Sequence, residues 1–151
     1  MSAIKLQAIL PRLDGIAKDV AKLKKMQRIS LAEFEKDEDK FGLVQYYLRQ
    51  ALEGVFHIGS HILSRLPGGR ATEYKEIARK LGEQRIVPKD FADTTLTKMG
   101  GYRNRLTHFY AEVTPGEIFQ IIQENLGDFE IFSQHIKEVL KNPQKFNVTV
   151  E

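Results

Sequence analysis

Apolar residues near the start of the chain recur at alternating steps of three and four, the spacing that places them along one side of an α-helix. They are Leu6, Ile9, Leu13, Ile16, Val20 and Leu23. Pro11 interrupts this segment, so we expect a helix that either kinks at Pro11 or starts near it. A short helix is expected next, because Ser30 and Glu33 have the spacing of a capping box.

The longest apolar stripe follows an acidic linker at residues 37–40 and predicts the strongest helix of the chain. The stripe consists of Val44, Leu48, Ala51, Val55, Ile58, Ile62 and Leu66. Pro67, Gly68 and Gly69 are expected to end this helix, since proline cannot continue the helical hydrogen bonds and glycine favours turns.

Further helices are predicted in the second half of the chain. One covers about residues 72–84, and another begins at Pro88. The clearest helix start is the run Thr114-Pro115-Gly116-Glu117, which combines a Thr cap, Pro at the first helical position and Glu at the third. A single last helix is expected from there until Asn142-Pro143.

These elements together predict an all-α fold. Short loops make neighbouring helices antiparallel, so we expect an antiparallel bundle of four long helices and one or two short ones. We expect one domain over residues 1–151, with a short irregular tail from about residue 142. Strand character is limited to residues 146–150, a segment too short to build a sheet alone.

The composition is that of a globular protein, with 42% hydrophobic and 28% charged residues among 151. Cysteine is absent, which excludes disulfides, thiolate metal sites and thiol nucleophiles. No apolar run approaches the roughly 20 residues that span a bilayer, and the chain does not begin with a secretory segment, so a cytoplasmic protein is expected. The net charge of +3 permits a polyanionic partner without requiring one.

The residues that could carry chemistry lie at positions 102–110, near the end of a predicted helix. At 100° per residue, Asn104 and His108 share one face, and Arg103 and Tyr110 nearly eclipse each other on the adjacent stripe. Arginine binds phosphate through two donors and histidine exchanges a proton near neutral pH, so this set suits phosphodiester chemistry. RNA supplies its own nucleophile, the 2′-hydroxyl, and its cleavage would then need neither a metal nor a covalent intermediate.

A simpler interpretation stays open, since Arg and His on one helix face usually form solvated surface. Arg105 is a further candidate for substrate contact, although two helical steps turn it about 160° away from Arg103. Glu53, His57 and His61 have the i, i+4, i+8 spacing of metal ligands on a helix, but a groove between helices or subunits is the more ordinary interpretation. We therefore expect no metal site.

Residues 103–108 resemble the R-x4-H signature of HEPN domains, with Arg103 and His108 at its ends and Asn104 within it. Tyr110 extends the pattern to R-x4-H-x-Y, the form found in the HepT ribonuclease toxins. The resemblance covers most of the chain, because the long helix around Glu53 is similar to the family's second core helix. The segment leading into the motif and the final helix from Thr114 also fit.

This resemblance implies a HEPN-like bundle that acts as a homodimer and cuts RNA in a cleft between two motifs, without metal or other cofactor. Arg103 and His108 would be catalytic, and Asn104 would position them. The implied partner is an MntA-type nucleotidyltransferase antitoxin, which attaches AMP to Tyr110. The added bulk and negative charge would block the cleft and repel RNA.

The chain departs from the family pattern at two positions. Phe109 stands where glycine is common, and His57 stands where an acidic residue is common. Glu53, His57 and Arg105 are candidates for lining the groove or contacting RNA. The alternative function is a non-catalytic HEPN module that binds a nucleotidyltransferase or a nucleotide with the same side chains, and a purely structural homodimer is a weaker third.

Overall fold

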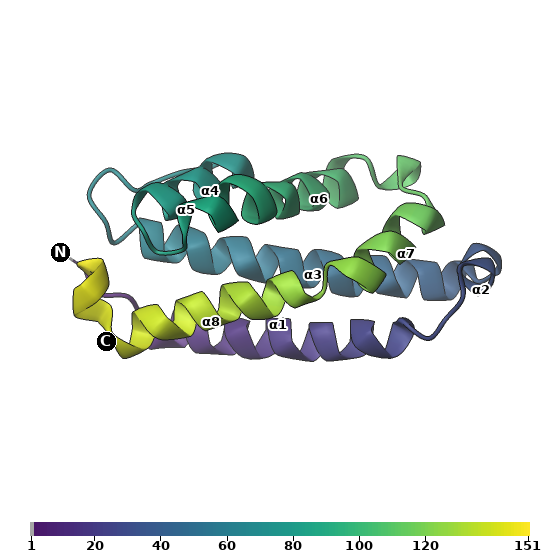
Figure 1. Ribbon diagram of the computed structural model, residues 1–151, viewed down its shortest axis with the longest axis horizontal. Helices are drawn as coiled ribbons and strands as arrows, with labels where there is room; N and C mark the ends of the chain where they lie inside the picture. Colours follow the sequence, from purple (N-terminus) through teal and green to yellow (C-terminus); the bar gives the residue numbers. More distant parts are fainter. Residues whose placement is uncertain (1) are drawn as a thin grey trace.

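The computed structural model describes residues 2–151, and helices dominate it (Figure 1). The longer helices are α1 (Leu6–Met26), α3 (Glu38–Leu63), α6 (Thr97–His108) and α8 (Gly127–Lys141). The shorter ones are α2 (Leu31–Lys36), α4 (Tyr74–Glu83), α5 (Lys89–Phe91) and α7 (Pro115–Glu124). This confirms the predicted all-α fold, with more short helices than expected. In the described part of the chain, no helix has the combination of length and apolar character that crossing a membrane requires.

Helix α3 lies at the centre of the molecule, with α1 and α8 on one side and α4 and α6 on the other (Figure 1). The predicted apolar stripe of α3 is buried, and so is a second stripe of Leu52, Phe56, Gly59 and Leu63. The second stripe faces α4, because a Cβ built on Gly59 would lie 2.8 Å from a methyl carbon of Leu81. Both faces of α3 are therefore covered.

Pro11 neither starts nor ends the first helix. Helix α1 begins five residues earlier and continues through Pro11 in its second turn. The ring removes one backbone donor, the one that would bond to the carbonyl of Gln7. Both Pro11 and Gln7 are exposed residues, so the interruption falls on the solvent side and the buried stripe of the helix is continuous.

The predicted last helix is instead two helices, which corrects the expectation of a single element. Helix α7 ends at Glu124, where the Asn125 backbone N–H bonds to the Ile121 carbonyl. Leu126 then turns into the core, where it is buried, and Gly127 begins α8. An unbroken helix would keep the apolar spacing, but burying Leu126 at the bend lets the two segments follow different parts of the core.

Helix α5 runs into α6 through a π-helical turn, η1 (Ala92–Leu96). The helix predicted to begin at Pro88 is thus one continuous run with an irregular second turn. In this turn the Thr97 hydroxyl donates a hydrogen bond to the Ala92 carbonyl, five residues back. Such turns are rare and often occur near functional sites.

The C-terminal tail is more ordered than the irregular segment that was expected. Residues Pro143–Phe146 form a 3-10 helix, η3, and Asn147 then adopts a left-handed conformation with φ of 57°. Val150 forms an isolated parallel bridge with Ile4, and the Ile4 N–H donates to the Thr149 carbonyl over 2.8 Å. The strand character of the tail is therefore realised as one bridge that joins the two ends of the chain.

His61 has a structural role at the start of α1. Its Nε2 accepts a hydrogen bond of 3.0 Å from the Lys5 backbone N–H, which leads into that helix. Burial lowers the pKa of His61 from its ordinary value, and the positive charges of Arg65, Arg12 and Lys5 lower it further. The neutral imidazole that accepts this bond is thus the favoured form.

Acidification below about pH 6.5, the ordinary pKa of histidine, is expected to destabilise the fold. As the pH decreases in that range, the unfolded chain binds a proton at residue 61 before the folded chain does. The free energy of unfolding therefore decreases as the pH decreases, until folded His61 is also protonated. Thermal unfolding on both sides of pH 6.5 measures this. His61→Gln should reduce the pH dependence, whereas exposed His57→Gln should retain it; equal slopes for His61→Gln and the wild type would contradict this assignment. Burial also lowers the pKa of His135, so some dependence should persist.

Candidate active site

The predicted motif lies in the last turns of α6, which ends at His108. Met99 and Leu106 are buried and attach this helix to the core. Phe109 then leaves the helical conformation with φ of −126°, and its N–H bonds to the Arg105 carbonyl. His108 is therefore the last residue of the helix, at the point where the chain turns away.

Arg103, Asn104 and His108 line one open pocket with a volume of ≈ 520 Å³. The opposite wall consists of residues 72–75, the loop end and first turn of α4, and Phe109 also borders the pocket. The structure therefore brings together the three residues that were predicted to form the site. The pocket lies at the amino-terminal end of α4, an environment that favours anions.

Tyr110 does not share this pocket. The expected alignment of Tyr110 with Arg103 requires the helix to continue to residue 110, and it stops two residues earlier. Tyr110 instead opens a 3-10 turn, η2 (Tyr110–Glu112), and is 67% exposed. The expected alignment fails because the backbone of Phe109 leaves the helical conformation and turns the chain at the end of α6.

The Arg103 side chain is held between an aromatic ring and a carboxylate. Its guanidinium carbon lies 4.3 Å from the centre of the Tyr74 ring, and its Nη2 lies 3.5 Å from Oε1 of Glu53. The side chain is only 16% exposed. Its buried Nε has no hydrogen-bond partner among the described residues. The predicted groove residue Glu53 is thus beside the motif, while Tyr74 is a contact that the spacing of residues did not reveal.

Tyr74 can lie beneath Arg103 because α4 approaches α6 closely at a glycine. A Cβ added to Gly100 would lie 3.2 Å from Cβ of Tyr74 and 3.4 Å from Cζ of Phe56. The Tyr74 and Phe56 rings also meet edge to face, with centres 4.9 Å apart. A Cβ at position 100 would make these neighbours shift by a few tenths of an ångström, so glycine allows the close approach that places Tyr74 beside Arg103.

The remaining candidates on α3 lie apart from this pocket. His57 is exposed and does not line it, although it is one turn from Glu53. His61 is partly buried and occupied by its bond to Lys5. Across residues 2–151, no group of three His, Cys, Asp or Glu side chains could hold a metal ion.

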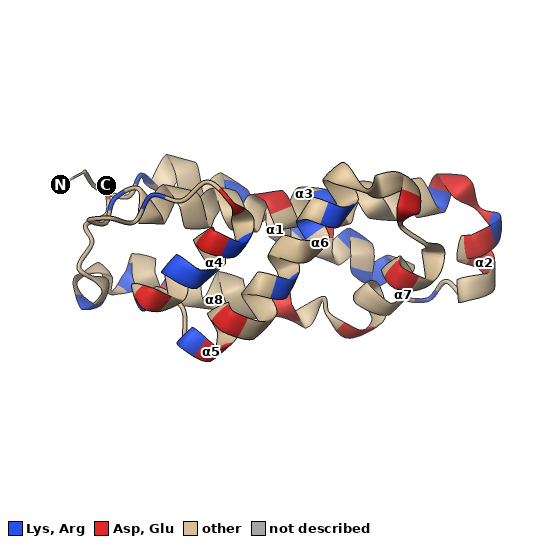
Figure 2. Cartoon of the chain, turned by 90° about the horizontal axis from the view of Figure 1, so that it is seen from above, with Lys and Arg blue, Asp and Glu red and all other residues tan. Residues whose placement is uncertain are grey.

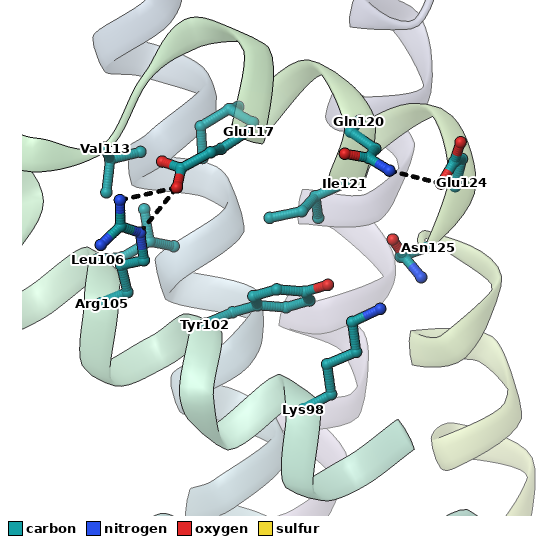
Figure 3. Close-up of a pocket in the computed structure, with 11 residues that line it drawn as sticks. Lys98, Tyr102, Arg105, Leu106, Val113, Glu117, Gln120, Ile121, Glu124 and Asn125 are labelled. Atoms are coloured by element: carbon teal, nitrogen blue, oxygen red, sulfur yellow. Dashed lines mark hydrogen bonds and ion pairs between the residues drawn. The ribbon is translucent and has the colours of Figure 1, made fainter. Parts of the chain in front are cut away.

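Arg105 points to the other side of α6, as the helical rotation indicated. Its Nε and Nη2 donate to Oε1 of Glu117 on α7 over 3.1 and 2.7 Å (Figure 3). Glu117 also completes the capping box with Thr114. This ion pair borders a second pocket of ≈ 300 Å³, with an apolar floor that includes Leu106 and Ile121. The structure therefore does not bring Arg105 to Arg103 and His108.

Comparisons with solved structures place the fold in one class. The chain is 23% identical to a tri-AMPylated HEPN toxin of Shewanella oneidensis solved in complex with MNT antitoxin, over 91% of this chain and 99% of that one, with a TM-score of 0.76. It superimposes with a TM-score of 0.75 on a toxin–antitoxin structure with AMP-PNP, at 22% identity over 90% of this chain and 99% of that one. These likenesses show the HEPN fold.

The sequence comparisons are more specific. The family model described as Ribonuclease HepT-like matches residues 16–136, so the chain belongs to this family. The chain is also 27% identical over 140 residues to a tRNA nuclease HepT of Aphanizomenon flos-aquae, which covers 93% of this chain and 95% of that protein. The family predicted from the R-x4-H-x-Y pattern is therefore confirmed. The enzyme class of this family is ribonuclease.

Removing the Arg105–Glu117 ion pair is expected to weaken the attachment of α7 to α6. Both side chains are 40% exposed, so Arg105→Ala should lower the free energy of unfolding by about 0.5–1 kcal/mol in urea denaturation. Glu117→Ala should lower it by about 1–2 kcal/mol, because it also removes the capping box. The exposed pair Arg79–Glu83 provides a control, since Arg79→Ala should change stability less. Equal losses for Arg105→Ala and Arg79→Ala would contradict this.

The same contact should depend on pH in the acidic range. The backbone hydrogen bond from Thr114 lowers the pKa of Glu117 below its ordinary value of 4.5, and Arg105 lowers it further. Its stabilisation is therefore complete above about pH 4.5 and is lost as the pH falls through the lowered value. The difference in stability between wild type and Glu117→Ala should disappear over that interval.

Proposed function

We propose that this protein is the ribonuclease toxin of a toxin–antitoxin pair, which cleaves RNA through Arg103 and His108 without a metal ion. The observation that carries this proposal is the shared pocket of Arg103, Asn104 and His108, which lies in a member of the Ribonuclease HepT-like family. Transfer RNA is the substrate class we propose, because the curated relative is named a tRNA nuclease.

The charge distribution around the motif supports a phosphate ligand. The charged residues of α6 are all basic, whereas acidic residues gather at the end of the molecule where α2 meets α3 (Figure 2). Lys75 of α4 also lines the motif pocket, together with Glu73, the residue before that helix. A phosphate in this pocket would meet the Arg103 guanidinium and the positive end of α4 together.

The proposed chemistry assigns one role to each motif residue. The His108 imidazole takes the proton of the RNA 2′-hydroxyl, whose oxygen attacks the adjacent phosphorus. The bond from phosphorus to the 5′-oxygen breaks, and a second imidazole protonates that oxygen, which leaves a cyclic 2′,3′-phosphate and a 5′-hydroxyl. Arg103 stabilises the charge that develops on the phosphoryl oxygens, and Asn104 positions the phosphate or the imidazole.

This division of acid and base requires two imidazoles, and each chain contributes one motif histidine. We therefore propose a homodimer in which two motifs meet. The exposure of Phe109 (53%) and Tyr110 directly after His108 supports an interface there, because large exposed aromatic side chains commonly mark protein contacts. Glu53, which pairs with Arg103, and His57 would lie along the resulting groove, while Arg105 would face away from it.

Control by a nucleotidyltransferase antitoxin is proposed on two grounds. The HEPN toxin of similar fold is AMPylated and bound to an MNT antitoxin, and Tyr110 here is two residues from His108 and exposed. In this reaction the Tyr110 hydroxyl attacks the α-phosphorus of ATP and pyrophosphate leaves. The new phosphodiester would place a negative charge beside the motif and repel the RNA backbone.

Purified wild-type chain is expected to cleave tRNA in the presence of EDTA, whereas Arg103→Ala and His108→Ala should each lose at least about a hundredfold in rate. Gel analysis of end-labelled tRNA measures this, and a cyclic phosphate terminus should be found on the product. Arg79→Ala, an exposed arginine of α4 away from the motif pocket, should cleave like the wild type. Sedimentation should give twice the 17.3 kDa chain mass for the active species.

Three outcomes would contradict this function. Full activity in His108→Ala would remove the assigned base, and a strict Mg²⁺ requirement would contradict the chemistry. Binding of the nucleotidyltransferase without any RNA cleavage would favour the non-catalytic HEPN module instead.

Co-expression with the cognate nucleotidyltransferase is expected to add one or more AMP groups to Tyr110 and to abolish RNA cleavage. Mass spectrometry of the intact chain and its peptides measures the modification. Tyr110→Phe should stay unmodified, because it lacks the attacking hydroxyl. Tyr46→Phe removes another exposed tyrosine hydroxyl and should be modified like the wild type. AMP attached elsewhere in the chain, with Tyr110 free, would overturn the assignment.

A further inference from the structure

The Tyr74 ring lies against the guanidinium of Arg103. In the described structure, Tyr74 makes no hydrogen bond to Arg103. We infer that Tyr74 is a positioning residue for the ribonuclease reaction, because its ring face holds the Arg103 guanidinium in the orientation that presents its N–H groups to the scissile phosphate. This inference rests on the proposed function, since it assumes that Arg103 binds the phosphate of RNA.

The contact fixes the guanidinium without consuming its donors. A cation above an aromatic face is held by the ring's quadrupole, so this contact pairs no guanidinium N–H with an acceptor atom. A carboxylate that bound Arg103 through two short hydrogen bonds would occupy the same edge that a phosphate needs. Glu53 does not do this, because its 3.5 Å approach to Nη2 is longer than a normal hydrogen bond.

The ring itself has little freedom to move. Phe56 of α3 meets it edge to face, and Gly100 of α6 lies against its Cβ. Tyr74 is the first residue of α4, so its backbone is also fixed by the helix. An orientation set by three helices is transmitted to Arg103, whose own Nε makes no hydrogen bond within the described residues that could set it.

Without the ring, the strongest remaining attraction on Arg103 is the Glu53 carboxylate. An aliphatic side chain at position 74 fills space but has no negative ring face, so the guanidinium would move toward Glu53 and form the closer pair that competes with phosphate. Loss of the Tyr74 ring would thus misalign the reacting phosphate. This misalignment should lower kcat, while KM, which reflects contacts along the whole RNA, should change little.

The test compares Tyr74→Leu and Tyr74→Phe in steady-state cleavage of tRNA by the full-length chain. Tyr74→Leu should lower kcat about tenfold with KM within about twofold, and Tyr74→Phe, which keeps the ring, should stay within about twofold of the wild type in both. Adding Glu53→Gln to Tyr74→Leu should restore part of kcat, an effect that a general loss of packing would not produce. Tyr74→Met replaces Tyr74→Leu if thermal unfolding shows that the latter is not folded at the assay temperature.

Tyr47→Leu is the matched control, because Lys22 lies 4.8 Å from the centre of the Tyr47 ring, on helices away from the motif pocket. It should retain the wild-type kcat. An unchanged kcat in Tyr74→Leu, together with an inactive Arg103→Ala, would overturn this inference and leave the proposed function intact. A loss in Tyr74→Phe equal to that in Tyr74→Leu would overturn it as well. A wild-type chain that cleaves no RNA would overturn the proposed function and this inference together.

Discussion

The burial of α3 on two opposite faces determines where the other helices lie. One stripe of its apolar residues packs on the layer that contains α1, and the other packs on α4 and α6. Between the stripes, Glu53 stays partly exposed at the edge of the second layer, beside Arg103. A change in the rotation of α3 would move Phe56 from under Tyr74 and Glu53 from the motif at once. The core and the site therefore depend on the same packing.

The repeating apolar spacing made the helical fold predictable, because burying one stripe of a helix requires residues three and four apart. The start of α7 was equally clear, since the capping box of Thr114 and Glu117 depends on neighbouring residues alone. The bend at Leu126 was not predictable in this way. Its apolar side chain fits either an unbroken helix or a buried turn, and only the shape of the surrounding core decides between them.

The site shows the same division between local and distant contacts. Arg103, Asn104 and His108 lie within two turns of one helix, so their common pocket followed from the helical rotation, and the family resemblance pointed to Glu53. Tyr74 is 29 positions away from Arg103 along the sequence, and its place depends on how α4 packs at Gly100. The orientation of Tyr110 was missed because the helix ends at His108, which the aromatic residues that follow do not reveal.

The π-helical turn η1 sets the angular position of everything that follows it. A turn closed by bonds to the fifth residue contains one residue more than an α-helical turn, and one residue corresponds to about 100° of rotation. If Ala92–Leu96 were wound as an ordinary α-helix with α5 fixed, Arg103 would swing by roughly that angle away from the Tyr74 ring. The extra residue thus acts as a phase adjustment between the part of the helix anchored at Pro88 and the part that carries the histidine.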